Sequence, residues 1–346
     1  MRESIKRAIA FLNVLLAMMA WMDVPGAIGN DIAGKKAIDT QGLRQFLPDT
    51  GQKHCFDNLR QIPCPEPEEP FFGQDGNYIM NEPKYSVIGA GKQNILVDLV
   101  TGLSWQKVNS YGASWSQALD AVDSLVEKSG EKWRLPNIYE LATLASYGWD
   151  QDIVFAVFNA AGDINDCFWS ITSPDDSANP LGYCSVSKSM RIFDRDERLK
   201  VLSVKGPPFI PGRFVAGVNG TVVIDEETGL MFQAGEQQPM TWVQALEYCK
   251  KLKLGGYSDW RLPNIRELMT IVSFDREGPP YLDSRFFPWA RAGTYWSSTT
   301  VEEAPYMAWT LDFSNGLPYR AGFKARRYFV RAVRAGRRIK NPLNRK

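Results

Sequence analysis

A run of cations near the C-terminus is the part of this sequence whose residue types most directly suggest chemistry. From Leu317 to Lys346 there are eleven Lys or Arg residues and no Asp or Glu. Arginine makes bidentate contacts with sulfate and phosphate groups, and aromatic residues are interleaved with the cations here. The run therefore predicts a polyanion-binding face, and the alternative is a strand with a solvated face followed by a disordered end. The candidate residues are Arg320, Lys324, Arg326, Arg327, Arg331 and Arg334.

The remaining polar residues offer little for catalysis or metal binding. His54 is the only histidine, so neither a histidine zinc cluster nor a repeated catalytic triad can be built. The acidic run starting at Asp225 could bind calcium, but the related segment at Asp98 keeps only one of its three acids, which favours a solvated turn. We expect no metal, no cofactor and no catalytic residue. The net charge of +1 argues against bulk nucleic-acid binding.

The cysteines indicate an oxidising compartment. Five are present, and two pairs lie close in sequence. We expect disulfides between Cys55 and Cys64 and between Cys167 and Cys184, which leaves Cys249 unpaired.

The N-terminus has the composition of a secretory signal. Cations within the first seven residues precede an apolar run over residues 8–22, which is too short to span a bilayer. Small residues at Ala27 and Gly29 predict cleavage near residue 29, with an uncleaved membrane anchor as the alternative. The mature protein is expected to be soluble and periplasmic, displayed on the cell surface, or secreted.

One pattern of four blocks occurs twice. Its most specific block, Trp-Arg-Leu-Pro-Asn-x-x-Glu-Leu, starts at Trp133 and again 127 positions later at Trp260. The other blocks repeat in the same order, so the sequence contains a duplicated domain. They begin at Asp98 and Asp225, at Ser114 and Thr241, and at Phe168 and Tyr295.

Each copy has signals for a β-hairpin, two helices and further strands. In the second copy, residues 222–224 and 230–232 flank a loop closed by Gly229, which is typical of a hairpin. Thr241 and Asn264 each stand three residues before Gln or Glu at the start of an amphipathic segment, the spacing of a helix-starting capping box. Gly255 and Gly256 are expected to end the first helix. Strands near residues 296–300, 308–313 and 327–334 complete a predicted α+β domain with a largely antiparallel sheet.

These motifs together resemble the C-terminal domain family of the Legionella collagen-like protein, a domain of bacterial exported proteins. The Trp-Arg-Leu-Pro and Trp-Ser motifs are also similar to those of C-type-lectin-like folds. The resemblance implies two tandem C-type-lectin-like domains, at residues 85–206 and 207–336. A Pro/Gly-rich leader at 30–84 would precede them, and a basic tail at 337–346 would follow.

The resemblance also implies a function. The family's best-known member is understood as an adhesin that binds sulfated glycosaminoglycans, which implies carbohydrate binding. Relatives often pair a cysteine at the position of Cys249 with one in the final strand, which this chain lacks. Cys249 is therefore expected to be a buried free thiol.

The repeated tryptophans and arginines are expected to build the scaffold. The tryptophans lie within helical and strand patterns, so core packing is favoured over a sugar-stacking surface. Arg134 and Arg261 are expected to pair with a carboxylate such as Asp98 or Asp225 and to fix the turn before a helix, rather than to hold an anionic ligand beside Asp259. The structural motif residues are Trp133, Arg134, Pro136, Trp169, Trp260, Arg261, Pro263 and Trp296.

Three hypotheses for function follow. The leading one is a non-enzymatic recognition or adhesion protein that binds an anionic glycan or cell-wall polymer, through the second copy because it keeps the motifs more closely. The alternative is a structural module of a surface or secretion assembly that docks a surface protein. An enzyme on a scaffold like that of the formylglycine-generating group is less favoured, since those enzymes use reactive cysteines and only Cys249 is unpaired.

Overall fold

The computed structural model describes residues 47–89, 94–148, 167–174, 179–276 and 278–335. The predicted signal segment, the first part of the leader and the basic tail at 337–346 lie outside these residues. Within the described residues, none of the helices combines the length and the apolar character that crossing a bilayer requires.

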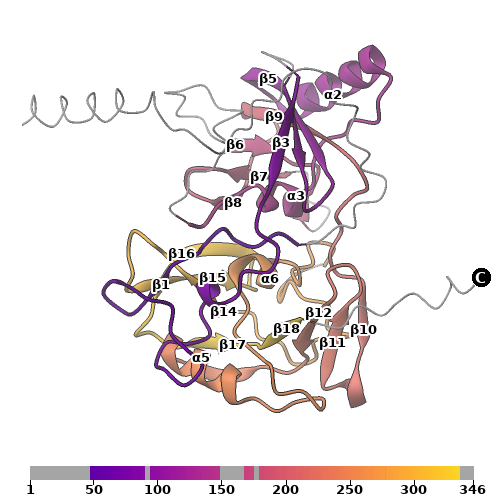
Figure 1. Cartoon of the computed structure of the whole chain (residues 1–346). Coiled ribbons are helices and arrows are strands. Elements are labelled where there is room, and N and C mark those ends of the chain that lie inside the picture. Colours follow the sequence, from indigo (N-terminus) through magenta and orange to yellow (C-terminus); the bar gives the residue numbers. More distant parts are fainter. Residues whose placement is uncertain (1–46, 90–93, 149–166, 175–178, 277, 336–346) are drawn as a thin grey trace, which may run out of the picture. The chain divides into compact units, whose positions relative to one another are not determined.

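The first copy is built on one seven-stranded sheet (Figure 1). All its pairings are antiparallel except that between β6 and β9. Its helices are α2 (Trp115–Ser129) and α3 (Ile138–Thr143). In spatial order the strands are β3 (Tyr85–Ile88), β4 (Ile95–Asp98), β5 (Ser104–Ala113), β9 (Leu199–Lys205), β6 (Cys167–Trp169), β7 (Leu181–Cys184) and β8 (Ser189–Ile192).

The second copy keeps this strand order but divides it between two sheets. Its helices are α5 (Trp242–Lys251) and α6 (Ile265–Met269). One sheet orders β10 (Phe214–Ala216), β11 (Val222–Asp225), β12 (Leu230–Gln233) and β18 (Val333–Ala335). The other orders β13 (Gln237–Met240), β17 (Tyr328–Val330), β14 (Thr294–Thr300), β15 (Met307–Asp312) and β16 (Leu317–Phe323).

A buried arginine marks the division. The guanidinium of Arg331 donates to the carbonyl oxygens of Gln233 and Ala234, at 2.7 and 2.6 Å. Those carbonyls lie where β12 ends and the chain turns toward β13. The structure is thus a mixed α and β protein with mostly antiparallel sheets, as the pattern of strands and helices predicted.

The leader also has described structure. It contains a short hairpin of β1 (Cys55–Phe56) and β2 (Gln61–Ile62), and a 3-10 turn, η1 (Asp75–Asn77). Both predicted disulfides are present, Cys55–Cys64 in the leader and Cys167–Cys184 between β6 and β7. Two disulfides are typical of an oxidising, extracytoplasmic compartment.

Each of these α-helices begins at a predicted capping box. The N-cap side chain accepts the backbone N–H three residues later, and the side chain of that later residue accepts the N-cap N–H. The expected end of α5 at the glycine pair is wrong. The helix ends at Lys251 because Leu252 is already extended, and Gly255 and Gly256 form a separate turn at positive φ. The boxes are Ser114 with Gln117, Asn137 with Glu140, Thr241 with Gln244 and Asn264 with Glu267.

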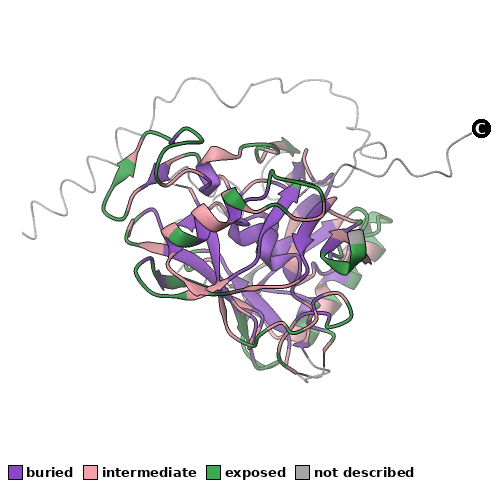
Figure 2. Ribbon diagram, turned by 90° about the horizontal axis from the view of Figure 1, so that it is seen from below, coloured by how far each residue is buried: buried purple, intermediate pink, exposed green. Residues whose placement is uncertain are grey.

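The core is continuous between the copies. Buried residues, purple in Figure 2, are concentrated in the strands, while exposed residues gather in the connecting loops. One buried cluster contains side chains of both α3 and α6, such as Leu141 and Leu268. Tyr147 and Trp309 pack edge to face within it, with 5.0 Å between ring centroids.

Candidate functional site

Three of the six candidate polyanion-binding cations are buried. The Lys324 ammonium lies 3.8 Å from the Trp242 ring centroid, and burial lowers its pKa to about 7. Arg331 is fully enclosed, and Arg334 forms a two-bond ion pair with Asp259 at 2.7 and 2.9 Å. These three side chains lie in the interior of the second copy. They are therefore not part of an exposed binding face, contrary to the sequence-based expectation.

The other three cations, Arg320, Arg326 and Arg327, are exposed in β16 and the turn after it. Exposed aromatic rings accompany them. The rings of Tyr306 and Phe323 are stacked, with 5.9 Å between centroids, and the Arg326 guanidinium lies 5.7 Å from the Phe323 ring. Sequence reasoning missed Tyr306 because it lies outside the cationic run. We call this surface the arginine–aromatic face, and its members are Tyr306, Tyr319, Arg320, Phe323, Arg326 and Arg327.

The motif arginines pair with the glutamates of the capping boxes rather than with Asp98 or Asp225. Arg134 donates two bonds to Glu140, at 2.8 and 2.6 Å. Arg261 makes the same bidentate pair with Glu267. The expected role in fixing the turn before the helix holds, but the carboxylate comes from the helix itself.

The two aspartates close the hairpin turns instead. Asp98 accepts the N–H groups of Val100 and Thr101, and Asp225 accepts the N–H of Glu227 and the Thr228 hydroxyl. In the part of the chain that the structure describes, no group of three or more His, Cys, Asp or Glu side chains is placed to hold a metal ion.

The structural motif residues occupy the same roles in both copies. The Trp169 and Trp296 indoles donate to the carbonyls of Ala113 and Met240, at 2.6 and 2.8 Å. Trp133 and Trp260 are also buried. The carbonyls of the motif prolines accept equivalent backbone N–H groups, Pro136 from Ile171 just after β6 and Pro263 from Ser298 in β14, both at 2.8 Å.

The potential nucleophiles are enclosed. Cys249 is a free, buried thiol, and burial raises its pKa. Ser170 and Ser297 are buried and donate to the carbonyls of Leu181 and Trp309, both at 2.7 Å. The imidazole of His54, by contrast, is partly exposed, and its Nδ1 lies 3.8 Å from a carboxylate oxygen of Glu302. A thiol with a raised pKa is a poor nucleophile because the thiolate is the reactive form.

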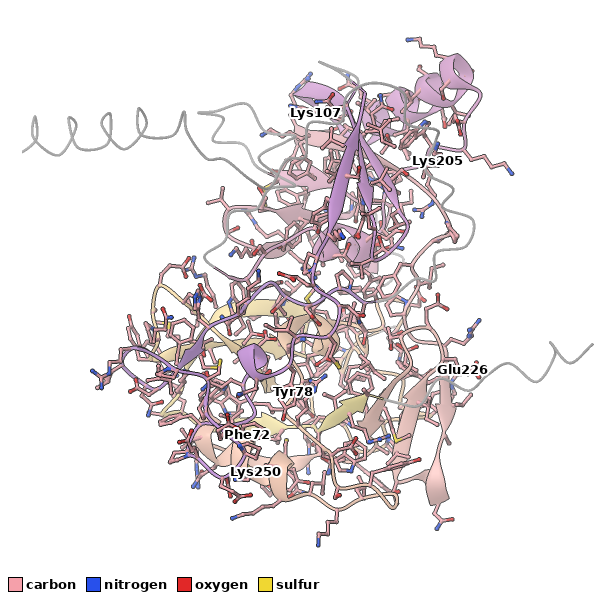
Figure 3. All side chains as sticks on the ribbon, in the orientation of Figure 1. Phe72, Tyr78, Lys107, Lys205, Glu226 and Lys250 are labelled. Atoms are coloured by element: carbon pink, nitrogen blue, oxygen red, sulfur yellow. A yellow bond between two sulfur atoms is a disulfide. The ribbon has the colours of Figure 1, made fainter. Side chains whose placement is uncertain are left out.

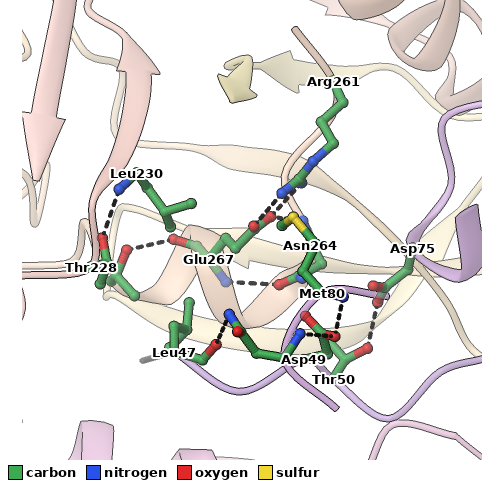
Figure 4. A network of polar contacts seen from close by, with 12 residues as sticks. Leu47, Asp49, Thr50, Asp75, Met80, Thr228, Leu230, Arg261, Asn264 and Glu267 are labelled. Atoms are coloured by element: carbon green, nitrogen blue, oxygen red, sulfur yellow. Dashed lines mark hydrogen bonds and ion pairs between the residues drawn. The ribbon is translucent and has the colours of Figure 1, made fainter. Parts of the chain in front are cut away.

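The leader covers the Arg261–Glu267 pair of the second copy. The Asp75 carboxylate accepts the hydroxyls of Thr50 and Thr299, at 2.7 and 2.6 Å. The Tyr78 ring, labelled in Figure 3, has its centroid 5.0 Å from the Arg261 guanidinium. Figure 4 shows Thr50 and Asp75 beside the ion pair. No sequence motif had pointed to this contact.

Burial of Asp75 predicts a dependence of stability on pH. Desolvation raises the pKa of Asp75 to about 7, against the lowering effect of the two threonine hydroxyls. This folded-state pKa exceeds the unfolded-state value near 3.9, so the fold favours the protonated form of Asp75. Its contribution to the free energy of unfolding is complete below about pH 4 and is lost as the pH rises through about 7. Wild type should therefore gain stability relative to Asp75→Asn when the pH falls from about 8 to about 5.

Urea denaturation midpoints of the two proteins across this range provide the measurement. The comparison isolates Asp75, because the other titrating groups are common to both proteins. A stability difference that stays constant with pH would contradict the assignment.

A cavity of about 1000 Å³ lies beside the equivalent groups of the first copy, and residues of the second copy, among them Phe274 and Arg276, also line it. Arg134 and Asn137 line it, as do Thr172 and Ser173 from the segment after β6. The corresponding positions in the second copy are Arg261, Asn264, Thr299 and Thr300. The leader therefore covers in the second copy a set of groups that line an opening in the first.

Both copies match one known protein family. Residues 94–203 and residues 221–334 each match the family model of the Lcl C-terminal domain. No curated protein matches the sequence significantly.

Proposed function

Because this chain belongs to the Lcl C-terminal domain family, of which it carries two tandem copies, we propose that it is an exported, non-enzymatic recognition or adhesion protein. It binds anionic glycans or cell-wall polymers through the arginine–aromatic face of the second copy. We further propose that each copy has a C-type-lectin-like core, which is supported by the Trp-Arg-Leu-Pro and Trp-Ser motifs.

The exposed stack of Tyr306 and Phe323 beside arginines carries the proposal. Tyr306 is 49% exposed and Phe323 is 43% exposed, although their rings offer large apolar area. Arginine forms planar, two-bond contacts with sulfate and carboxylate groups, and an aromatic face packs against apolar ligand surface. A surface with both is suited to an acidic sugar polymer.

The local charge distribution supports the second copy over the first. The corresponding segment of the first copy also has exposed arginines, Arg191, Arg195 and Arg198. There, however, Asp194, Asp196 and Glu197 are interspersed with them. In the second copy no acid occurs from Leu317 onward, and an ion pair of this face joins Arg320 to Glu303 at 3.2 Å. Neighbouring carboxylates reduce the attraction for a polyanion.

Heparin-column retention, measured as a function of salt, tests this function. We expect wild type to be retained and to elute as salt rises, because screening weakens exposed charge pairs. A variant with Arg320→Glu, Arg326→Glu and Arg327→Glu should lose at least about ten-fold in affinity, equivalent to about 1.4 kcal/mol. Circular dichroism would establish that this variant remains folded.

The matched control carries Arg191→Glu, Arg195→Glu and Arg198→Glu, which changes the net charge equally. This control should be retained nearly as well as wild type. Equal losses in both variants would indicate attraction by overall charge and would contradict a defined face. Weak retention of wild type would favour the structural-module alternative, and rapid thiol labelling of Cys249 in the folded protein would revive an enzymatic role.

A further inference from the structure

Three leader side chains contact the second copy at Arg261 and the end of β14. The side-chain amide of Gln52 donates to the carbonyl of Thr300 at 2.8 Å and accepts its N–H at 2.9 Å. The Asp75 carboxylate accepts the Thr299 hydroxyl. The Tyr78 ring lies over Arg261. An amide, a carboxylate and an aromatic ring of one polypeptide therefore fill this place.

The first copy keeps the same receiving groups in the same local geometry. The Thr172 hydroxyl accepts the N–H of Ile138 at 3.0 Å, as Thr299 accepts that of Ile265 at 3.0 Å. Arg134 has the same bidentate pair as Arg261, to Glu140. The duplication has thus preserved the arrangement and not only the sequence motif.

The first copy differs in that these groups remain accessible. The Arg134 side chain is 29% exposed, against 6% for Arg261. Thr172 and Ser173 are partly exposed, whereas Thr299 and Thr300 are fully buried. Ile171 is 45% exposed at the position where Ser298 is 1% exposed. The linker after the first copy contacts Glu140 through the Phe209 N–H, yet the cavity remains open beside it.

We propose that the cavity of the first copy binds a segment of a partner polypeptide that carries a carboxylate and an aromatic side chain, as the leader does in the second copy. The carboxylate of the segment accepts the Thr172 hydroxyl. Its aromatic ring packs over Arg134, and an amide pairs with the backbone of Ser173.

The walls of the cavity favour a polypeptide over an acidic polysaccharide. Tyr139, Phe214 and Phe274 contribute aromatic surface, and Ile171 adds apolar surface at the rim. The charged lining is balanced, because Arg276 and Arg285 are accompanied by aspartates, including Asp283, which pairs with Arg285 at 2.6 Å. A cavity that combines apolar walls with charges of both signs matches a mixed set of peptide side chains better than a uniform polyanion.

The test uses a peptide with the sequence of residues 47–84 and its disulfide closed, titrated into the full chain by calorimetry. The second copy is occupied by the chain's own leader, so the added peptide reports on the first copy. We expect saturable binding of one peptide per chain. Peptides carrying Asp75→Asn or Tyr78→Ala should bind at least about ten-fold more weakly.

A matched pair of protein variants locates the site. Ile171→Glu puts a negative charge at the exposed rim and should weaken peptide binding at least about ten-fold. Ile192→Glu changes an isoleucine that is 53% exposed in β8, outside the cavity lining, and should bind like wild type.

Absence of saturable peptide binding would overturn this inference, as would equal binding by wild type and Ile171→Glu. Heparin fragments that compete with the peptide, and whose binding Ile171→Glu abolishes, would reassign the cavity to a polysaccharide. The inference stands apart from the glycan-binding proposal, since the variant with Arg320, Arg326 and Arg327 changed to Glu should bind peptide normally.

Discussion

Replacing Glu267 with Gln should lower the free energy of unfolding by about 3–5 kcal/mol, because it leaves the Arg261 guanidinium buried without its counter-charge. Glutamine keeps the size of the side chain and an acceptor for the Asn264 N–H, so the loss reports mainly on charge. Urea denaturation followed by far-ultraviolet circular dichroism measures the effect.

The duplication supplies the control. Glu140→Gln removes the same carboxylate from the same capping box, but Arg134 reaches solvent and can be hydrated in the variant. We expect a smaller loss, of about 1–2 kcal/mol. If the two substitutions cost the same, burial by the leader would not be the source of the difference.

Trp296→Ala should lower the free energy of unfolding by about 3–5 kcal/mol, the usual cost of removing a fully buried aromatic side chain. Trp296 is fully buried in β14, packs at 4.6 Å from the Tyr328 ring and donates to the carbonyl of Met240. The substitution leaves a cavity and removes the hydrogen bond to the Met240 carbonyl. Thermal and urea denaturation of the purified variant provide the measurement.

Trp289→Ala is the comparison for this second substitution. That tryptophan is 85% exposed, so its removal should change stability by no more than about 0.5 kcal/mol. A Trp296 variant as stable as this control would show that the motif tryptophan does not support the core.

The features predicted correctly from sequence depend on residues close together in the chain. A capping box involves four consecutive residues, so Asn137 with Glu140 and Asn264 with Glu267 could be identified without knowledge of the fold. The same holds for the Cys55–Cys64 and Cys167–Cys184 pairs, which are 9 and 17 residues apart. The hairpin of β11 and β12 needed only a local turn.

The errors arose where burial depends on distant partners. Arg331 and Arg334 look like solvated cations in sequence, but carbonyls near Ala234 and the carboxylate of Asp259 receive them in the fold. The prediction of aspartate partners for the motif arginines is wrong, because a sequence pattern does not show that the side chain of a capping-box glutamate points toward the arginine. The cover over Arg261 was missed because the leader has no repeat and no periodicity that marks a partner.

The Gln52–Thr300 contact has a consequence for the order of folding. It joins residues 248 positions apart, so the segment that leaves the ribosome among the first can reach its final place only after β14 exists. Closing so long a loop is slow, and we expect the leader to dock as one of the last steps. Because the leader contacts the second copy, we expect a recombinant fragment that begins at the repeat boundary to be less stable than the full chain. A fragment that starts at residue 207 would lack Tyr78, whose ring lies over Arg261.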